Sequence, residues 1–340
     1  MGSGEEPRGQ AHGLARPRTG RRGILAAAGL LAGGPLVQAA RAQDPSALPD
    51  GPIRIVVPLG AGGGIDAWTR MIAERLAPVW RVPVVVDNRS GANGAIGAAA
   101  VANAAPTGQT LLFSHSAVVL TPLLQRNVPY RLAQLAPMQF LADLPMALGV
   151  ARRETDSLPG LIALAKARPG RVAYASYGTG SASHIVGEML QRNAGIRLVH
   201  VPFRGEADAA TALIGGQVTA AFVSVGAVER FQEQMAFAAL AGPARLERHP
   251  EVPTFAELGV ADAALSGWMG VFAPAGSPAP LLQRMAADIR QVLTQEEVAR
   301  KARDFGFEPR PGGGPPFDAF VREQSGQWTA ALKETGISIE

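Results

Sequence analysis

Two glycine-rich turns hold the residues whose spacing could do chemistry. Turn one is residues 60–64, Gly-Ala-Gly-Gly-Gly, with Asp66 two positions later. Turn two is residues 178–181, Gly-Thr-Gly-Ser, with Ser183 two positions later. Each turn follows a short apolar run and precedes a helical pattern. Free backbone N–H groups and the helix dipole at such turns favour a negative group, most simply a carboxylate.

The elements around the two turns follow the same order. Strands are expected at 53–57, 82–86 and 110–113 in the first copy, and at 172–176, 198–201 and 218–223 in the second. Helices are expected from Asp66 and at 95–104, then from Ser183 and at 207–214. This alternation requires parallel strands with right-handed crossovers. The sequence therefore predicts a duplicated βαβαβ unit. The expected fold is an α/β protein with two lobes.

Ligands of open parallel sheets lie at the carboxyl ends of the strands. This rule places Ser114, His115 and Ser116 beside turn one, and Ser224 beside turn two. Residues 147–151 and 268–272 look like crossover strands between the lobes. A hinge of two strands permits closure around a ligand.

The same pattern suggests where the domains begin and end. Residues 1–42 are expected to be a signal peptide, residues 43–150 plus 267–340 lobe one, and residues 151–266 lobe two. Three further helices are expected at 280–293, 296–304 and 317–333, packing back on lobe one.

The N-terminal segment carries the sequence marks of export. Arg21 and Arg22 precede the apolar run 24–37, and Ala40-Arg41-Ala42 is a small-x-small cleavage site that predicts a mature start at Gln43. The paired arginines fit a twin-arginine signal, with an ordinary secretory signal as the alternative. Either route leads to the periplasm. The apolar run is too short to span a bilayer, so we expect a mature protein that is not embedded in the membrane.

Composition narrows the function classes further. The six arginines and two glutamates of residues 1–42 account for the whole net charge of +4, so the mature chain has no basic surplus for nucleic acid. The chain has no cysteine, which excludes a lipid-modified N-terminus, disulfides and thiol catalysis.

The sequence gives little support to an enzyme, a nucleotide-binding site or a metal site. A hydrolase could be built from Ser114-His115-Ser116 or Ser183-His184 with Asp66, but no G-x-S-x-G turn is present. Ile65 stands where a dinucleotide fingerprint needs glycine. The four histidines after residue 42 show no paired ligand spacing. We predict no enzyme activity, no catalytic residue, no cofactor and no metal.

A family resemblance adds to this interpretation. The chain resembles the substrate-binding receptors of the tripartite tricarboxylate transporters, the Bug family, over residues 52–340. The motifs that carry the resemblance stand in the family's order: Pro52-Ile53-Arg54-Ile55-Val56-Val57-Pro58, the turn ending in Asp66, Val84-Val85-Val86-Asp87-Asn88-Arg89, Pro106-Thr107-Gly108, Ser183-His184, Val199-His200-Val201-Pro202-Phe203, Gly216-Gln217-Val218, Pro250-Glu251-Val252-Pro253-Thr254 and Phe272-Ala273-Pro274-Ala275-Gly276.

The resemblance implies a periplasmic binding protein of type II, a Venus flytrap of two α/β lobes that delivers a small carboxylate to a membrane transporter. We expect a monomer that meets the transporter's membrane subunits transiently. A sensor that feeds a two-component system needs the same liganded state and stays an alternative. The expected ligand-binding residues are Gly62, Gly63, Gly64, Ile65, Asp66, Ser114, His115, Ser116, Thr179, Gly180, Ser181, Ser183, Phe203 and Ser224.

The chain departs from the family pattern at the site. Ala61, Gly64 and Ile65 replace a proline and two hydroxyl residues. Lobe one must therefore bind the ligand through backbone amides or water. Val223 stands where many members carry aspartate, which makes an ammonium-bearing ligand less expected.

Four side chains near the turns each have two alternative roles. Trp68, Phe203 and Trp268 could wall the ligand, although the spacing of Trp68 with its helical neighbours favours a core position. For Asp66 we favour satisfying N–H groups at the helix start over touching an anionic ligand.

Overall fold

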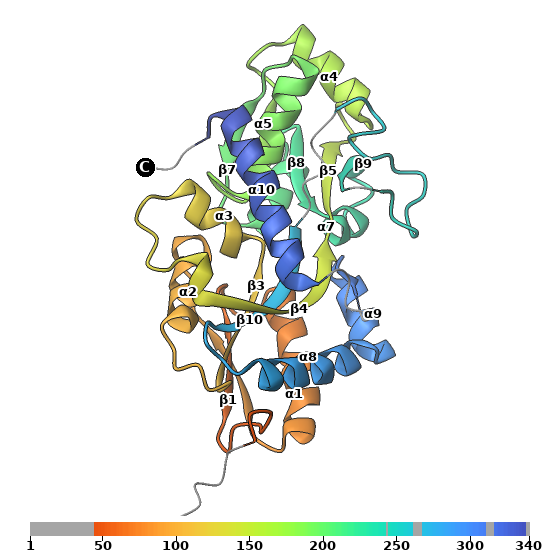
Figure 1. Cartoon of the computed structure of the whole chain (residues 1–340). Coiled ribbons are helices and arrows are strands. Elements are labelled where there is room, and N and C mark those ends of the chain that lie inside the picture. The colour runs from red at the N-terminus through yellow and green to blue at the C-terminus, as the bar shows by residue number, and fades with distance from the viewer. Residues whose placement is uncertain (1–43, 243, 261–266, 311–315, 338–340) are drawn as a thin grey trace, which may run out of the picture. The chain divides into compact units, whose positions relative to one another are not determined.

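The computed structural model describes residues 44–242, 244–260, 267–310 and 316–337. The predicted signal peptide and its cleavage site lie outside these residues. Residues Gln43–Glu340 form one compact unit, and Figure 1 shows its two sheets with the helices around them. Every helix within the described part of the chain falls short of the length and apolarity needed to cross a membrane.

The first sheet has six strands in the order β11-β4-β10-β3-β1-β2. Their bounds are β1 (Ile53–Val57), β2 (Val84–Asn88), β3 (Thr110–His115), β4 (Leu135–Leu144), β10 (Gly267–Pro274) and β11 (Glu308–Pro309). Strand β1 pairs in parallel with β2 and β3, whereas β10 runs antiparallel to both β3 and β4. We call this sheet and its helices lobe one.

The second sheet has five strands in the order β7-β6-β8-β5-β9. Their bounds are β5 (Met146–Ala151), β6 (Ala173–Ser176), β7 (Val199–Pro202), β8 (Ala220–Ser224) and β9 (Met235–Ala241). Strand β6 pairs in parallel with β7 and β8, whereas β5 runs antiparallel to β8 and β9. We call this sheet and its helices lobe two.

The two sheets share one topology, which confirms the two-lobed α/β fold. In each, the first βαβαβ strand lies between the second and the third, and a strand arriving from the other sheet comes next. The arriving strands β5 and β10 are the predicted crossovers, and Figure 1 shows β4 running into β5. They run antiparallel to their neighbours, so both sheets are mixed and only the βαβαβ strands are parallel.

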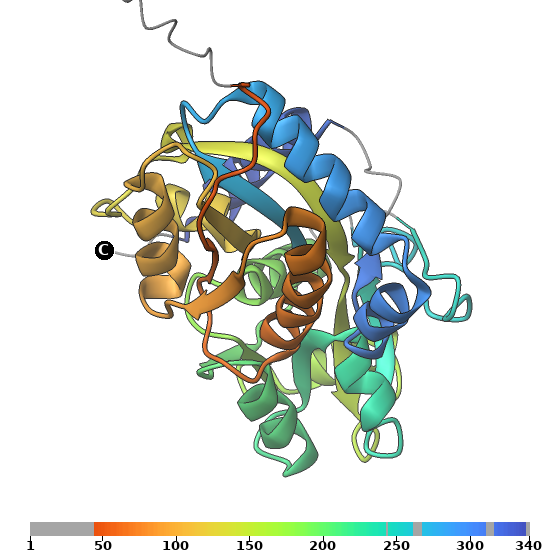
Figure 2. The ribbon, with the colours of Figure 1, turned by 90° about the horizontal axis from the view of Figure 1, so that it is seen from below.

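Helices cover both faces of each sheet. Their bounds are α1 (Gly64–Trp80), α2 (Ala95–Ala102), α3 (Ala117–Leu124), α4 (Leu158–Ala167), α5 (Ala182–Ala194), α6 (Glu206–Ile214), α7 (Val225–Arg230), α8 (Ala279–Leu293), α9 (Glu296–Asp304) and α10 (Phe317–Thr335), with 3-10 turns at Ala92–Gly94 and Leu132–Gln134. Figure 2 shows α1 and α8 lying on one side of the first sheet.

Alternation along each central strand explains the layering. In lobe one, Ile55 packs with α1, α8 and α9, whereas its neighbour Val56 packs with α2, α3 and α10. In lobe two, Tyr174 packs with α4 and α5, whereas Ala175 packs with α6 and α7. Successive side chains of a strand point to opposite faces, so each sheet becomes the middle of three layers.

Helix α10 packs on lobe one as expected, and it packs on lobe two as well. Phe317 and Val321 belong to a core of lobe one. Trp328 and Ala331 belong to the core that α5 and the second sheet form. A helix of 19 residues extends over about 28 Å, long enough to reach past one core into the next. The division at residues 150 and 266 stays a prediction, with β5 paired in the second sheet.

Two glycines in helices allow a test of this packing. A Cβ on Gly187 of α5 would lie 2.3 Å from the ring of Tyr174, whereas one on Gly326 of α10 would meet nothing within 4 Å. We expect Gly187→Ala to destabilise the protein by about 1–3 kcal/mol through overpacking. Gly326→Ala should stabilise it by about 0.5–1 kcal/mol, because alanine favours helix. Urea unfolding measures both, and equal signs would contradict the packing of α5 on β6.

Candidate functional site

Turn one presents backbone N–H groups and no hydroxyl. Gly62 has φ +88°, a left-handed conformation that favours glycine, and Gly63 is the N-cap of α1 without a side chain to satisfy the helix. Among the described residues, the N–H groups of Gly63, Gly64 and Ile65 have no hydrogen-bond partner. Together they form a set of unpaired donors at the start of α1.

Asp66 holds turn one in shape. Its side chain is buried, and its carboxylate accepts hydrogen bonds from the Gly62 N–H at 2.8 Å and from Asn88 Nδ2 at 2.9 Å. Arg70 lies 3.1 Å from it on the next helical turn. Burial raises the pKa of Asp66, but these donors and the arginine outweigh burial and hold the pKa below its ordinary value. The Gly62 N–H is therefore already taken, and Asp66 acts as a support of the turn.

Turn two is held by serine hydroxyls. Ser181 is the N-cap of α5; its Oγ donates to the Gly178 carbonyl at 2.7 Å and accepts the His184 N–H at 3.3 Å. The single proton of Ser181 is thus used, so the Ser183 hydroxyl, 2.8 Å away, must donate to Ser181. Ser183 is fully buried and accepts the Tyr177 N–H at 2.9 Å. Both hydroxyls therefore fix the backbone of the turn.

Three N–H groups of turn two remain available. The Gly180 N–H donates to His184 Nδ1 at 3.1 Å and is occupied. Among the described residues, the N–H groups of Thr179, Ala182 and Ser183 have no partner. Lobe two therefore repeats the feature of lobe one, with backbone donors at a helix N-terminus.

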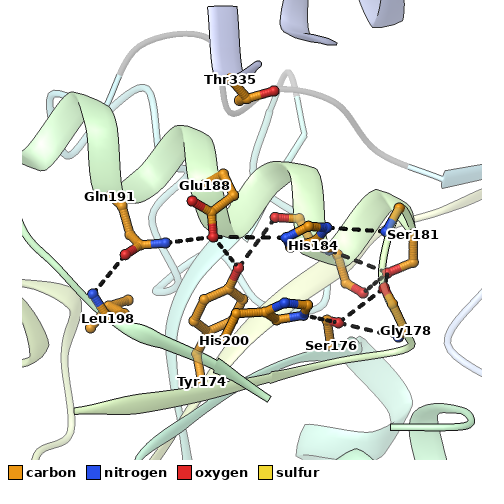
Figure 3. Close-up of polar contacts among 12 residues, drawn as sticks. Tyr174, Ser176, Gly178, Ser181, His184, Glu188, Gln191, Leu198, His200 and Thr335 are labelled. Carbon is orange, nitrogen blue, oxygen red and sulfur yellow. Dashed lines mark hydrogen bonds and ion pairs between the residues drawn. The ribbon is translucent and has the colours of Figure 1, made fainter. Parts of the chain in front are cut away.

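Behind turn two lies a pair of stacked histidines, shown in Figure 3. The rings of His184 and His200 are 3.9 Å apart and nearly parallel at 12°. His200 Nε2 lies 2.6 Å from Ser176 Oγ, and Tyr174 stacks on the other side of His200. Burial lowers the pKa of His200 to about 4, with a contribution from His184, while Glu188 opposes it. Both rings are neutral near pH 7, and His184 uses its unprotonated Nδ1 to hold turn two.

The predicted ligand-binding residues at the end of β3 are largely buried. Ser114 and Ser116 are buried, and the Ser114 hydroxyl donates to the His115 carbonyl at 3.3 Å. His115 Nδ1 accepts the Ala117 N–H at 3.2 Å, and burial lowers the pKa of His115 to about 4. Neither serine pairs with a histidine within the described ranges, so the hydrolase alternative gains no support from these residues.

The end of β8 brings together residues that the sequence did not connect. Ser224 is the N-cap of α7, and its hydroxyl donates to Glu206 Oε1 at 2.5 Å. Glu206 stands in the first turn of α6, and its charge acts on Tyr177, the residue just before turn two. The sequence analysis did not identify Glu206 because it considered an acidic residue only after the third strand of lobe two. The start of a helix after Arg204-Gly205 was the sequence feature that pointed to Glu206.

Contacts between the lobes connect turn one to the start of α7. The side chain of Phe305 packs on Gly64 of turn one, with its ring 3.1 Å from where a Gly64 Cβ would be. The backbone of Phe305 and Gly306 meets Gly226 of α7, and a Cβ on Gly306 would lie 2.6 Å from the Gly226 nitrogen. Arg248 of lobe two also pairs with Glu308 of β11. The stretch after α9 therefore joins the N-termini of α1 and α7.

The aromatic candidates separate into core and site. Trp68 is fully buried and its Nε1 donates to the Val298 carbonyl at 3.0 Å, so the expected core position is confirmed. Trp268 is buried as well and packs against Phe317. Phe203 is only partly buried, against a core of lobe two that also touches Tyr177.

Two further features of the described residues bear on where a site lies. The described residues contain no group of three or more potential metal ligands among histidine, aspartate and glutamate. A cavity of about 560 Å³ lies around Asp44, Asp50, Trp80, Arg81 and Arg284. These residues adjoin the amino ends of β1 and β2, the edge of the sheet opposite turn one.

Comparison with known proteins assigns the family. Residues 68–337 match the model of the tripartite tricarboxylate transporter family receptor. BugT of Bordetella pertussis is 33% identical over 298 residues, covering 86% of this chain and 91% of BugT. The chain belongs to the tripartite tricarboxylate transporter receptor family. Its Bug-type relatives also confirm the resemblance stated from the motifs.

Solved relatives share the fold and carry carboxylates. An R. palustris protein solved with adipate has a TM-score of 0.77 at 28% identity, covering 85% of this chain and 99% of that one. MatC from Rhodopseudomonas palustris, solved with bound malate, has a TM-score of 0.71 at 29% identity, covering 84% and 100%. Two solved structures of the same fold therefore hold small carboxylates.

Asp66 gives a prediction on stability. Asp66→Ala leaves the Gly62 N–H without its partner and removes one of the two acceptors of Asn88 Nδ2, so we expect a loss of about 1–3 kcal/mol in unfolding free energy at pH 7. The pKa of Asp66 is lowered from 3.8, so its contribution is complete above that pH and disappears as the pH falls through the lower folded value. The exposed Asp318, paired with Arg322, is the control, and Asp318→Ala should change little. Equal unfolding curves for Asp66→Ala and wild type would contradict the supporting role.

His200 gives a prediction on pH. The ordinary histidine pKa is 6.5, and His200 keeps a pKa of about 4 in the folded protein. Between these values the unfolded chain binds a proton that the folded one does not, so stability falls as the pH drops from 6.5 to 4. His200→Phe keeps the stacking but cannot titrate, and the slope of unfolding free energy against pH should become shallower while His115 and His184 maintain part of it. An unchanged slope would show that His200 is not responsible.

Proposed function

We propose that this protein is an extracytoplasmic solute receptor that binds a small carboxylate between turns one and two and delivers it to a tripartite tricarboxylate-type membrane transporter. One observation carries the proposal: two helix N-termini, at equivalent positions in the two lobes, each present three backbone N–H groups without a partner in the described structure. Such groups bind anions, and the dipoles of α1 and α5 act in the same sense.

The ligand residues take two roles in this proposal. Gly63, Gly64, Ile65, Thr179 and Ser183 donate backbone N–H groups, as does Ala182, which the sequence prediction omitted. Gly62, Asp66, Gly180 and Ser181 hold the turns in shape through the hydrogen bonds described above. Ser114, His115, Ser116, Phe203 and Ser224 form the surrounding wall. Transition between open and closed lobes occurs at the two crossover strands.

The relatives support the class of ligand. Adipate and malate, bound by two proteins of the same fold, are small carboxylates of the kind that two backbone turns can hold. Turn one has no hydroxyl donor, so lobe one contacts the ligand through backbone amides or through water. The protein acts as a binding protein and performs no catalysis.

The proposal includes the protein's location and partners. Residues 1–42 direct export to the periplasm, and cleavage after Ala42 releases the mature receptor, which acts as a monomer and meets the membrane subunits transiently. A sensor of carboxylates would use the same site. Deletion of the transporter genes distinguishes the two: uptake is lost in the first case, and a transcriptional response remains in the second.

Removing one N–H group tests the site. Ala182 is the first residue of α5, a position where proline is well tolerated. Ser181 before it has φ −71° and ψ 160°, the extended conformation that proline requires of its predecessor. Ala182→Pro therefore deletes one donor of turn two and leaves the helix intact. We expect affinity for a bound carboxylate to fall about tenfold or more.

The measurement is isothermal titration of the purified protein with succinate, malate, adipate and citrate. Ala182→Ser, which keeps the N–H, is the matched control and should bind like wild type. Urea unfolding without ligand checks that Ala182→Pro is as stable as the control. Wild-type affinity in a stable Ala182→Pro variant would overturn the assignment of turn two.

A further inference from the structure

We propose that Glu206 is the specificity-determining residue of the site and selects a carboxylate whose other end carries a hydrogen-bond donor, a hydroxyl or an ammonium group. This inference rests on the proposed function, because it names the ligand class of the same interlobe site. Turns one and two supply donors only. Glu206 supplies the acceptor that a second ligand group would meet.

The position of Glu206 follows from a continuous series of contacts. On one side, its charge acts on Tyr177, which immediately precedes turn two. On the other side, it accepts the hydroxyl of Ser224, the N-cap of α7. Gly226 of α7 meets Gly306, and Phe305 packs on Gly64 of turn one. Glu206 therefore lies beside the N-terminus of α7, which contacts the stretch that packs on turn one.

The carboxylate of Glu206 lacks a cationic partner in contact. Among the described residues it forms no ion pair, and Arg230 acts on it only at longer range. Burial raises the pKa of Glu206, which means that its charged form is poorly compensated. Ser224 donates to this carboxylate through its hydroxyl and its backbone N–H, and a carboxylate has about four lone-pair sites, so acceptor capacity remains. A partly buried charge of this kind is stabilised by a donor or a cation.

Ligand selectivity follows from charge. A second carboxylate placed against Glu206 would repel it, and a methyl group would leave its oxygens unpaired. Sites built to hydrogen-bond a ligand group discriminate strongly against analogues that lack the group. The Tyr177 hydroxyl, without a hydrogen-bond partner in the described ranges, can accept from the same ligand group. This inference departs from the expectation drawn from Val223, because Glu206 supplies an acid beside Ser224 from a different helix.

The test is a matched ligand series on the purified protein. Titration calorimetry compares butyrate, 4-hydroxybutyrate, 4-aminobutyrate and succinate, which differ only in the group at the far end. A shorter series of isobutyrate, lactate, alanine and methylmalonate places the same groups beside the carboxylate. We expect the hydroxyl or ammonium member of one series to bind at least about tenfold more tightly than its methyl and carboxylate counterparts.

Two variants of α6 assign the preference. Glu206→Gln keeps the size and removes the charge, and should reduce that preference at least about tenfold. Asp208→Asn removes an exposed carboxylate from the same helical turn and should leave it unchanged. A loss confined to the ammonium ligands identifies recognition of a cation, and a loss for the hydroxyl ligands identifies recognition of a neutral donor. The wild-type series decides the ligand class even if Glu206→Gln does not fold.

The outcomes separate this inference from the proposed function. Wild-type binding of succinate or butyrate as tight as that of the donor-bearing acids overturns the role of Glu206 and leaves the carboxylate receptor standing. An unchanged preference in Glu206→Gln, with normal stability, also overturns it. If no acid of either series binds, and citrate and adipate fail as well, the proposed function and the inference fall together.

Discussion

The structure depends on one constraint, the unsatisfied N–H groups at the start of an α-helix. A helix leaves its first N–H groups without partners, and side-chain caps usually satisfy some of them. In this chain Gly63 gives α1 no cap, and Ser181 gives α5 a cap that satisfies only His184. The remaining donors are stabilised best by an anion, so the local backbone creates the binding function.

Polar residues around each turn serve to keep those donors pointing outward. Asp66 in lobe one and the pair of Ser181 and Ser183 in lobe two use their hydrogen bonds on the turn backbone. His184 completes turn two from behind, with His200 stacked on it. The two lobes thus reach the same result with different side chains, a carboxylate in one and hydroxyls with an imidazole in the other.

Several contacts join the two lobes. The Gly306 and Gly226 backbones meet where no side chain would fit, and Phe305 extends this contact to Gly64. Helix α10 crosses from one core to the other, so it joins the lobes beyond the two crossover strands. The stretch after α9 and the packing of Trp328 therefore connect the lobes outside the two crossover strands. Glu206 adjoins this connection through Ser224, the N-cap of α7.

The sequence by itself determined the duplicated βαβαβ order, both turns, both crossover strands and the core position of Trp68. These features are local: glycine punctuation, apolar runs and helical spacing fix them without distant contacts. The sequence did not determine which N–H groups stay free, because Asp66 and His184 occupy two of them through contacts that only the folded turns create. It also did not determine the partners of Glu206, Ser224 and α10. These residues meet neighbours far along the chain, and only the tertiary structure brings a helix start beside a strand end and one helix against two cores.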